Sequence, residues 1–204
     1  MTISPPSSDI HLADRIALRA VLVVAVLGGA VLTTLGLFTA ISRVVDPSRY
    51  PVSVLADVVV PASSGGVVDA RADSVLVHTT DLSAGTLWLL AGGDFCSALT
   101  IALVTFGFGS VLWRVVQRQP FHRQTYLATI TAGSAIALGS LLSQGLGGLG
   151  QLAAATELST ALGGVTVPGF LFSPVPVVAG FGILALAYVF RAGAGLQRDT
   201  EGLV

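Results

Sequence analysis

Residues 113–126 read WRVVQRQPFHRQTY, a short basic segment between two long apolar runs. The segment contains three arginines, Arg114, Arg118 and Arg123, and no carboxylate. Cytoplasmic loops of membrane proteins carry an excess of arginine and lysine, so this segment is predicted to face the cytoplasm. Its position then sets the orientation of every other apolar run in the chain.

The composition is that of an integral membrane protein. Of 204 residues 53% are hydrophobic and 10% are charged, and the mean hydropathy is +0.85. An ordinary soluble domain has roughly 25% charged residues, and a soluble fold of this size cannot bury so much apolar surface. The net charge of -1 and the scattered arginines argue against direct binding of nucleic acid. The single Cys96 excludes an internal disulfide.

Four apolar runs follow one another along the chain, at residues 20–42, 95–113, 124–156 and 174–190. Roughly 20 apolar residues suffice to cross a bilayer as a helix. The predicted fold class is therefore an all-α membrane protein, a four-transmembrane-helix bundle with a small extracytoplasmic β-hairpin insertion between helices 1 and 2. We expect a multi-pass protein of the plasma membrane with both termini in the cytoplasm. A cleaved signal peptide is the alternative for the first run, which is longer than the roughly 7 to 15 apolar residues of such peptides.

The expected boundaries follow from charges, prolines and glycines. We predict a disordered cytoplasmic tail over residues 1–14 and a single membrane domain over residues 15–204. Ser83 is the expected cap of the second helix, Ser173 and Pro174 are expected to begin the fourth, and the glycine-rich residues 145–150 are expected to end the third. The predicted elements are helix 1 over 18–42, an outer loop with strands over 43–82, helix 2 over 84–117, an inner loop over 118–125, helix 3 over 126–147, an outer loop over 148–172, helix 4 over 174–194 and an inner tail over 195–204.

The first outer loop has the pattern of a β-hairpin. Residues 52–60 are rich in β-branched side chains and end at Pro61, residues 63–66 supply turn chemistry, and residues 75–80 are the expected partner strand. A lone hairpin is marginally stable in water, so it should pack on the outer ends of the helices or on a neighbouring subunit. Residues 165–167 are a further candidate strand.

Small residues are the expected contacts between the helices, because lipid tails give no hydrophobic drive to bring helices together. We interpret their spacing as packing within one bundle, with the seam of a homo-oligomer as the alternative. The predicted packing residues are Ala25, Gly29, Ala98, Ala102, Gly133, Ala137, Gly139 and Gly180.

No pattern in the sequence points to catalysis. Ionisable residues are absent from the middle of every apolar run, and the chain has one Cys and three His. We therefore predict no enzyme, no catalytic residue, no cofactor and no metal site. Gln144 is expected either to hydrogen-bond across helices or to lie at the outer interface.

Two short motifs carry a resemblance to a known family. One is Arg118-Gln119-Pro120-Phe121, and the other is the ending FRAGAGLQRDTEGLV at residues 190–204. With these motifs the chain resembles the bacterial domain-of-unknown-function family 2975. The resemblance implies a four-helix membrane protein whose gene often neighbours a small helix-turn-helix regulator, and it implies no activity.

The inner face is the candidate binding surface. Pro120 ends the second helix and leaves Phe121 free to fold under the bundle. The predicted partner-binding residues are Arg114, Arg118, Pro120, Phe121, Arg123, Arg191 and Arg198. The plainer interpretation is that these charges lie among lipid headgroups and water, where an ion pair contributes about 0 to 1 kcal/mol.

The preferred hypothesis is a non-enzymatic regulatory or scaffolding module that acts on a cytoplasmic partner, with a helix-turn-helix protein as the candidate that the resemblance suggests. The alternative is an oligomeric pore, a carrier or a transporter accessory subunit. The lack of polar residues in the middle of the apolar runs counts against a pore or carrier.

Overall fold

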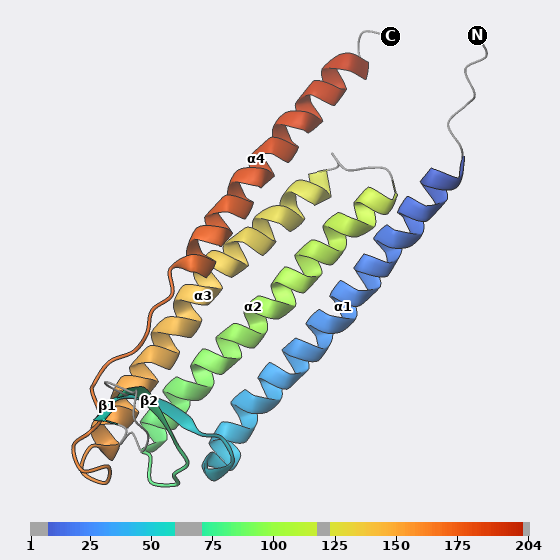
Figure 1. The fold of residues 1–204 in the computed structure, drawn as a ribbon. Coiled ribbons are helices and arrows are strands. Elements are labelled where there is room, and N and C mark those ends of the chain that lie inside the picture. Colours follow the sequence, from blue (N-terminus) through green and yellow to red (C-terminus); the bar gives the residue numbers. More distant parts are fainter. Residues whose placement is uncertain (1–7, 60–70, 118–122, 202–204) are drawn as a thin grey trace, which may run out of the picture. The chain divides into compact units, whose positions relative to one another are not determined.

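The protein is described by a computed structural model that covers residues 8–59, 71–117 and 123–201. It is mostly helical, with a small antiparallel sheet of two strands (Figure 1). The described elements are α1 (Ser8–Val45), the 3-10 turn η1 (Pro47–Arg49), β1 (Val52–Val59), β2 (Arg71–Val77), α2 (Ala84–Val116), α3 (Arg123–Leu158) and α4 (Val175–Glu201).

Three of the described helices are long and apolar enough to cross a membrane, namely Ile16–Val45 of α1, Ala84–Val116 of α2 and Gln124–Leu158 of α3. The apolar part of α4, Val175–Val189, is shorter. A helix of 33 residues is about 50 Å long at 1.5 Å per residue, whereas the hydrocarbon core of a bilayer is about 30 Å thick. Both α2 and α3 are therefore longer than a bilayer core is thick.

The chain divides into two compact units. The first unit contains Met1–Thr33, Thr100–Leu138 and Pro176–Val204, and in the described residues it is built only of helix. The second unit contains Thr34–Leu99 and Gly139–Val175, and it includes the sheet.

Helices of the first unit approach one another closely at small residues. A Cβ atom added to Gly180 of α4 would lie 2.6 Å from the backbone nitrogen of Ala137 on α3. A Cβ atom added to Gly133 of α3 would lie 3.0 Å from the backbone nitrogen of Leu184 on α4. Gly29 of α1 lies against the side chain of Thr105 on α2. Six of the predicted packing residues fall in this unit. Four of them, Gly29, Gly133, Ala137 and Gly180, lie at helix contacts, Ala102 is half-buried, and no contact of Ala25 is described.

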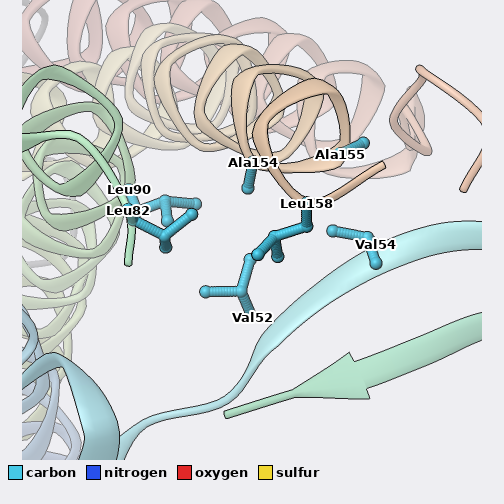
Figure 2. Packing of buried hydrophobic residues seen from close by; sticks show 7 residues of the cluster. All are labelled: Val52, Val54, Leu82, Leu90, Ala154, Ala155 and Leu158. Carbon is cyan, nitrogen blue, oxygen red and sulfur yellow. The ribbon is translucent and has the colours of Figure 1, made fainter. Parts of the chain in front are cut away.

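The hydrophobic core of the second unit joins the sheet to two helices. Val52 and Val54 of β1 point toward Leu82 and Leu90, at and near the start of α2, and toward the last turns of α3 (Figure 2). From α3 the cluster receives Ala154, Ala155 and Leu158. The expectation that the hairpin packs on the ends of the helices is therefore confirmed. In the same unit Ala98 is fully buried and lies against Gly36 of α1, while Gly139 is half-buried.

The sheet has a third, very short neighbour. β1 pairs with β2 in antiparallel register from Val52 opposite Val77 to Val59 opposite Arg71, with an irregularity between Leu55 and Val58. On its other edge β1 forms a bridge with Thr166, where Val167 donates its N–H to the carbonyl of Leu55 at 2.8 Å. The candidate strand at 165–167 is thus present as a single bridge. The predicted turn at residues 63–66 lies outside the described residues.

Two predicted tails are partly helical. The disordered tail was expected to reach residue 14, yet α1 begins at Ser8, and the inner tail was expected from residue 195, yet α4 continues to Glu201. Ser8 and Asp9 suit a helix start, and neither proline nor glycine follows them for several turns. The residues after Gly195 are mostly good helix formers, so the hydrophobic helix extends through them.

The prediction for the end of the third helix is wrong. Residue 147 was the expected end, but α3 continues to Leu158, and the outer loop shortens accordingly. Two of the glycines in residues 145–150 lie against α2: a Cβ added to Gly93 would lie 2.7 Å from the backbone nitrogen of Gly147, and a Cβ added to Gly150 would lie 2.9 Å from the backbone nitrogen of Leu90. Gly148 is covered by the ring of Phe170. The chain turns instead at Gly163 and Gly164, whose φ angles of 68° and 79° favour glycine.

We predict that Gly180→Ala lowers the stability of the protein while Gly182→Ala does not. The new methyl group at Gly180 would press on the backbone of Ala137, and overpacking of this kind costs about 1 to 3 kcal/mol. Around Gly182 no atom lies within 4 Å of an added Cβ. Thermal unfolding of both variants in one detergent measures the difference. Equal melting temperatures would show that α3 and α4 do not meet at Gly180.

Candidate functional site

The structure places part of the predicted partner-binding surface on three helix ends. Arg114 is half-buried in the last turn of α2, Arg123 is the first residue of α3, and Arg191 and Arg198 lie on α4. Arg118, Pro120 and Phe121 lie outside the described residues. The described part of this surface is therefore Arg114 and Arg191, together with the backbone positions of Arg123 and Arg198.

Arg191 has an aromatic partner that sequence reasoning missed. Its guanidinium carbon Cζ lies 5.9 Å from the ring centroid of Tyr126 on α3. A cation–π contact of this kind contributes about 0.5 to 1 kcal/mol at an exposed site. The pair holds Arg191 next to the first turn of α3. The sequence does not predict this pair, because it depends on the contact between α3 and α4. Beside it Thr125, which ends the basic segment, is fully buried and belongs to the packed helix.

A second polar cluster lies where α2 begins and α3 ends, in the second unit. The carboxylate of Glu157 accepts hydrogen bonds from the Ser83 N–H at 2.8 Å, the Ser83 hydroxyl at 2.7 Å and the Thr86 hydroxyl at 2.6 Å. Ser83 Oγ in turn accepts the N–H of Thr86 at 3.3 Å, so the predicted cap of the second helix is confirmed. Glu157 adds a negative charge at the N-terminus of α2, where a helix favours one.

These hydrogen bonds lower the pKa of Glu157. The largest cause is the hydrogen bond from Thr86, followed by those from the backbone and hydroxyl of Ser83, because all three favour the charged form. Glu157 lies 34 residues after Arg123, or about 51 Å along α3, which is beyond a hydrocarbon core about 30 Å thick that begins near Arg123. Because the pKa of Glu157 is lowered, the hydrogen bonds to its charged form stabilise the fold at pH values above the ordinary pKa of a glutamate. The contribution is lost as the pH falls through the lowered value.

An ion pair joins α1 to α2 in the same unit. Arg43 Nε lies 2.8 Å from Asp94 Oδ2, and the two side chains are 15% and 33% exposed. They are the first and last charged residues between the first two apolar runs, which was the available signal for pairing them. Breaking a fully buried pair costs about 3 to 5 kcal/mol and an exposed pair about 1 at most, so this half-buried pair lies between.

Gln144 makes a hydrogen bond to the chain just before α4. Its Oε1 accepts the N–H of Ser173 at 2.7 Å, and its buried Nε2 has no partner among the described residues. The predicted cap of the fourth helix at Ser173 is not formed, because α4 begins at Val175 and the Ser173 backbone is bonded to α3 instead. Pro176 lies in the first turn of α4, where its missing N–H costs little.

These polar groups hold helices together. Among the residues that the structure describes, no three His, Cys, Asp or Glu side chains form a group able to hold a metal ion. Glu157 is hydrogen-bonded by Ser83 and Thr86, and Asp94 is paired with Arg43, so each carboxylate is engaged by neighbouring structure. We interpret both clusters as structural and keep the arginine-rich helix ends as the candidate binding surface.

We predict that Glu157→Gln lowers the melting temperature near neutral pH and that the gap to wild type closes in acid. The glutamine keeps the shape of the side chain but loses the charge that Ser83 and Thr86 recognise. Asp81→Asn is the matched control, because Asp81 is an exposed acid of the same unit with no contact to Glu157 among those described. Melting curves across a pH series measure both. A gap for Glu157→Gln that stays constant down to strongly acidic pH would contradict the assignment.

Comparisons with known proteins found no relative of this chain. No family model, no curated protein and no solved structure matches the chain.

Proposed function

We propose that the protein crosses the plasma membrane four times, with both termini in the cytoplasm. Three described helices are long and apolar enough to cross. Along α1 the interval from Arg19 to Arg43 is about 36 Å, and along α2 the interval from Asp94 to Arg114 is about 30 Å, from 24 and 20 residues at 1.5 Å each. Both intervals suit a hydrocarbon core about 30 Å thick.

The fourth crossing is supported by sequence continuity. The apolar helix Val175–Val189 is short for a span, but no charged residue occurs between Glu157 and Arg191. The extended residues before α4 can therefore lie at the membrane edge without exposing charge to it. In this topology Arg114, Arg123 and Arg191 share the cytoplasmic side, as the positive-inside bias requires.

Within this topology the protein is a non-enzymatic regulatory or scaffolding module for a cytoplasmic partner. The observation that carries the proposal is the arginine-rich set of helix ends, where Arg191 is exposed and oriented by Tyr126 and Arg114 is half-buried. An exposed, oriented guanidinium suits a carboxylate-bearing protein surface. The family resemblance suggests a helix-turn-helix regulator as that partner.

A homo-oligomeric pore, carrier or accessory subunit is the second candidate. One observation favours it: Gly28 of α1 and Gly182 of α4 have open space where a Cβ would stand. Glycine faces without a contact in one chain suit close approach of a second chain.

The topology predicts which positions a membrane-impermeant maleimide reaches in intact cells. In a Cys96→Ala background, Asp81→Cys should react from outside and Gln117→Cys should react only after permeabilisation. Both positions are exposed in the structure, so protein burial does not decide the result. Labelling in the reverse order would overturn the proposed orientation.

We also predict that the tagged full chain, purified in mild detergent, retains a helix-turn-helix protein encoded beside its gene. The double substitution Arg114→Ala with Arg191→Ala should release it, because both guanidinium groups of the described surface are removed. Arg19→Ala removes a charge on the same side of the membrane and should retain the partner. Quantitative mass spectrometry of the eluates measures the ratio. Absence of any such protein from the wild-type eluate would end the partner proposal.

A further inference from the structure

We infer that the extended segment Phe170-Leu171-Phe172, between α3 and α4, binds the lipid surface of the outer leaflet. Leu171 and Phe172 would insert at the boundary between headgroups and acyl chains. The inference rests on the proposed membrane topology and deepens it, because it assigns a lipid-binding edge to a part of the chain that is not a spanning helix.

The segment exposes large apolar side chains in a region without charge. Leu171 is 81% exposed and Phe172 is 50% exposed. The surrounding sequence from residue 158 to residue 190 contains no charged residue. Loops in water are usually polar, and exposed apolar segments mark contact with a membrane or another protein.

Two contacts with α3 hold the segment on either side of Leu171. The ring of Phe170 covers Gly148, where an added Cβ would lie 2.6 Å from the ring atom Cγ. The N–H of Ser173 donates to Gln144 Oε1 at 2.7 Å. Leu171 thus stands on a fixed backbone, and its exposure is not that of a free tail.

Backbone chemistry limits how deep the segment can lie. Unpaired backbone N–H groups are costly near hydrocarbon, and proline has none. Pro168 and Pro174 border the segment, and the N–H of Ser173 is satisfied by Gln144. The N–H groups of residues 169–172 have no partner among the hydrogen bonds described, so this backbone would stay at the level of the headgroups, where water and phosphate accept hydrogen bonds, while the side chains of Leu171 and Phe172 insert.

The height of Gln144 along α3 favours lipid over a second copy as the occupant. Gln144 stands 21 residues after Arg123, or about 32 Å along the helix, which is close to the thickness of a hydrocarbon core. With Arg123 at the inner edge, Gln144 and the Ser173 bonded to it lie at the outer edge. Leu and Phe are side chains that insert at this level.

The test uses tryptophan as a depth reporter in the full chain. Trp88 and Trp113 are replaced by Phe, and single tryptophans are then introduced by Leu171→Trp, Val178→Trp and Ser74→Trp. Val178 lies in the apolar part of α4, and Ser74 is an exposed residue of β2. The protein is reconstituted in phosphatidylcholine vesicles whose acyl chains carry bromine near the headgroup or near the chain end.

We expect Leu171→Trp to be quenched more by shallow bromine than by deep bromine, with Ser74→Trp unquenched. Phe172→Trp repeats the test with an aromatic residue kept in place, should Leu171→Trp fail to fold. Quenching of Val178→Trp alone would overturn the inference and leave the topology standing, whereas no quenching at any position would overturn the topology itself. A blue-shifted Leu171→Trp emission that bromine leaves unchanged would show a protein partner or a second copy on this segment, and would also overturn the inference.

Discussion

Close approach of helix backbones at glycine and alanine is the contact on which this structure depends. In the first unit a Cβ added to Gly180 would lie 2.6 Å from the backbone of Ala137, and in the second unit a Cβ added to Gly93 would lie 2.7 Å from the backbone of Gly147. Helices in lipid gain nothing from hiding apolar surface, so van der Waals contact over a short distance has to supply the attraction. Small residues therefore do in this chain what leucine and phenylalanine do in the core of a soluble bundle. The same requirement explains Gly147 and Gly150, which lie against α2 and stand inside α3 despite the poor helix propensity of glycine.

Polar interactions fix the position of one segment along its neighbour, which close packing of small residues does not do by itself. Arg43 and Asp94 set α1 against α2, Glu157 sets the end of α3 against the start of α2, and Gln144 sets the chain before α4 against α3. Each of these pairs lies in the second unit, which also has a conventional hydrophobic core between β1 and two helices. Hydrophobic burial against water stabilises such a core. The second unit thus combines close contacts of small residues with an ion pair, hydrogen bonds and a hydrophobic core.

The sequence predicted the helical class and much of α2, but it could not predict the pairings. Ser83 and Arg114 mark the ends of α2 through local chemistry, a cap and a charge, and α2 was predicted nearly to the residue. The end of α3 was missed because a glycine run has two interpretations, a stop or a packing face, and only the presence of α2 beside it decides between them. Arg43 with Asp94, and Ser83 with Glu157, are far apart in the chain, so their contacts follow from the tertiary structure. At the inner face the arginines could be named from sequence, whereas the orientation of Arg191 by Tyr126 could not.

A regulatory role needs a physical element that belongs to both sides of the membrane, and α2 and α3 are the candidates. Each is a single continuous helix: α2 begins at the Ser83 cap and ends with Arg114 in its last turn, and α3 begins at Arg123 and ends next to Glu157. Ser83, Thr86 and Glu157 hold the two helices to each other by hydrogen bonds to a charged group, and these bonds depend on pH. The contacts at glycine do not depend on pH. Any change in the hydrogen bonds that Ser83 and Thr86 donate to Glu157 therefore acts on the same two helices that carry Arg114 and Arg123. In the proposed topology these two helices give the module a route from the Glu157 cluster to its cytoplasmic partner, without any ionisable group in the middle of the apolar runs.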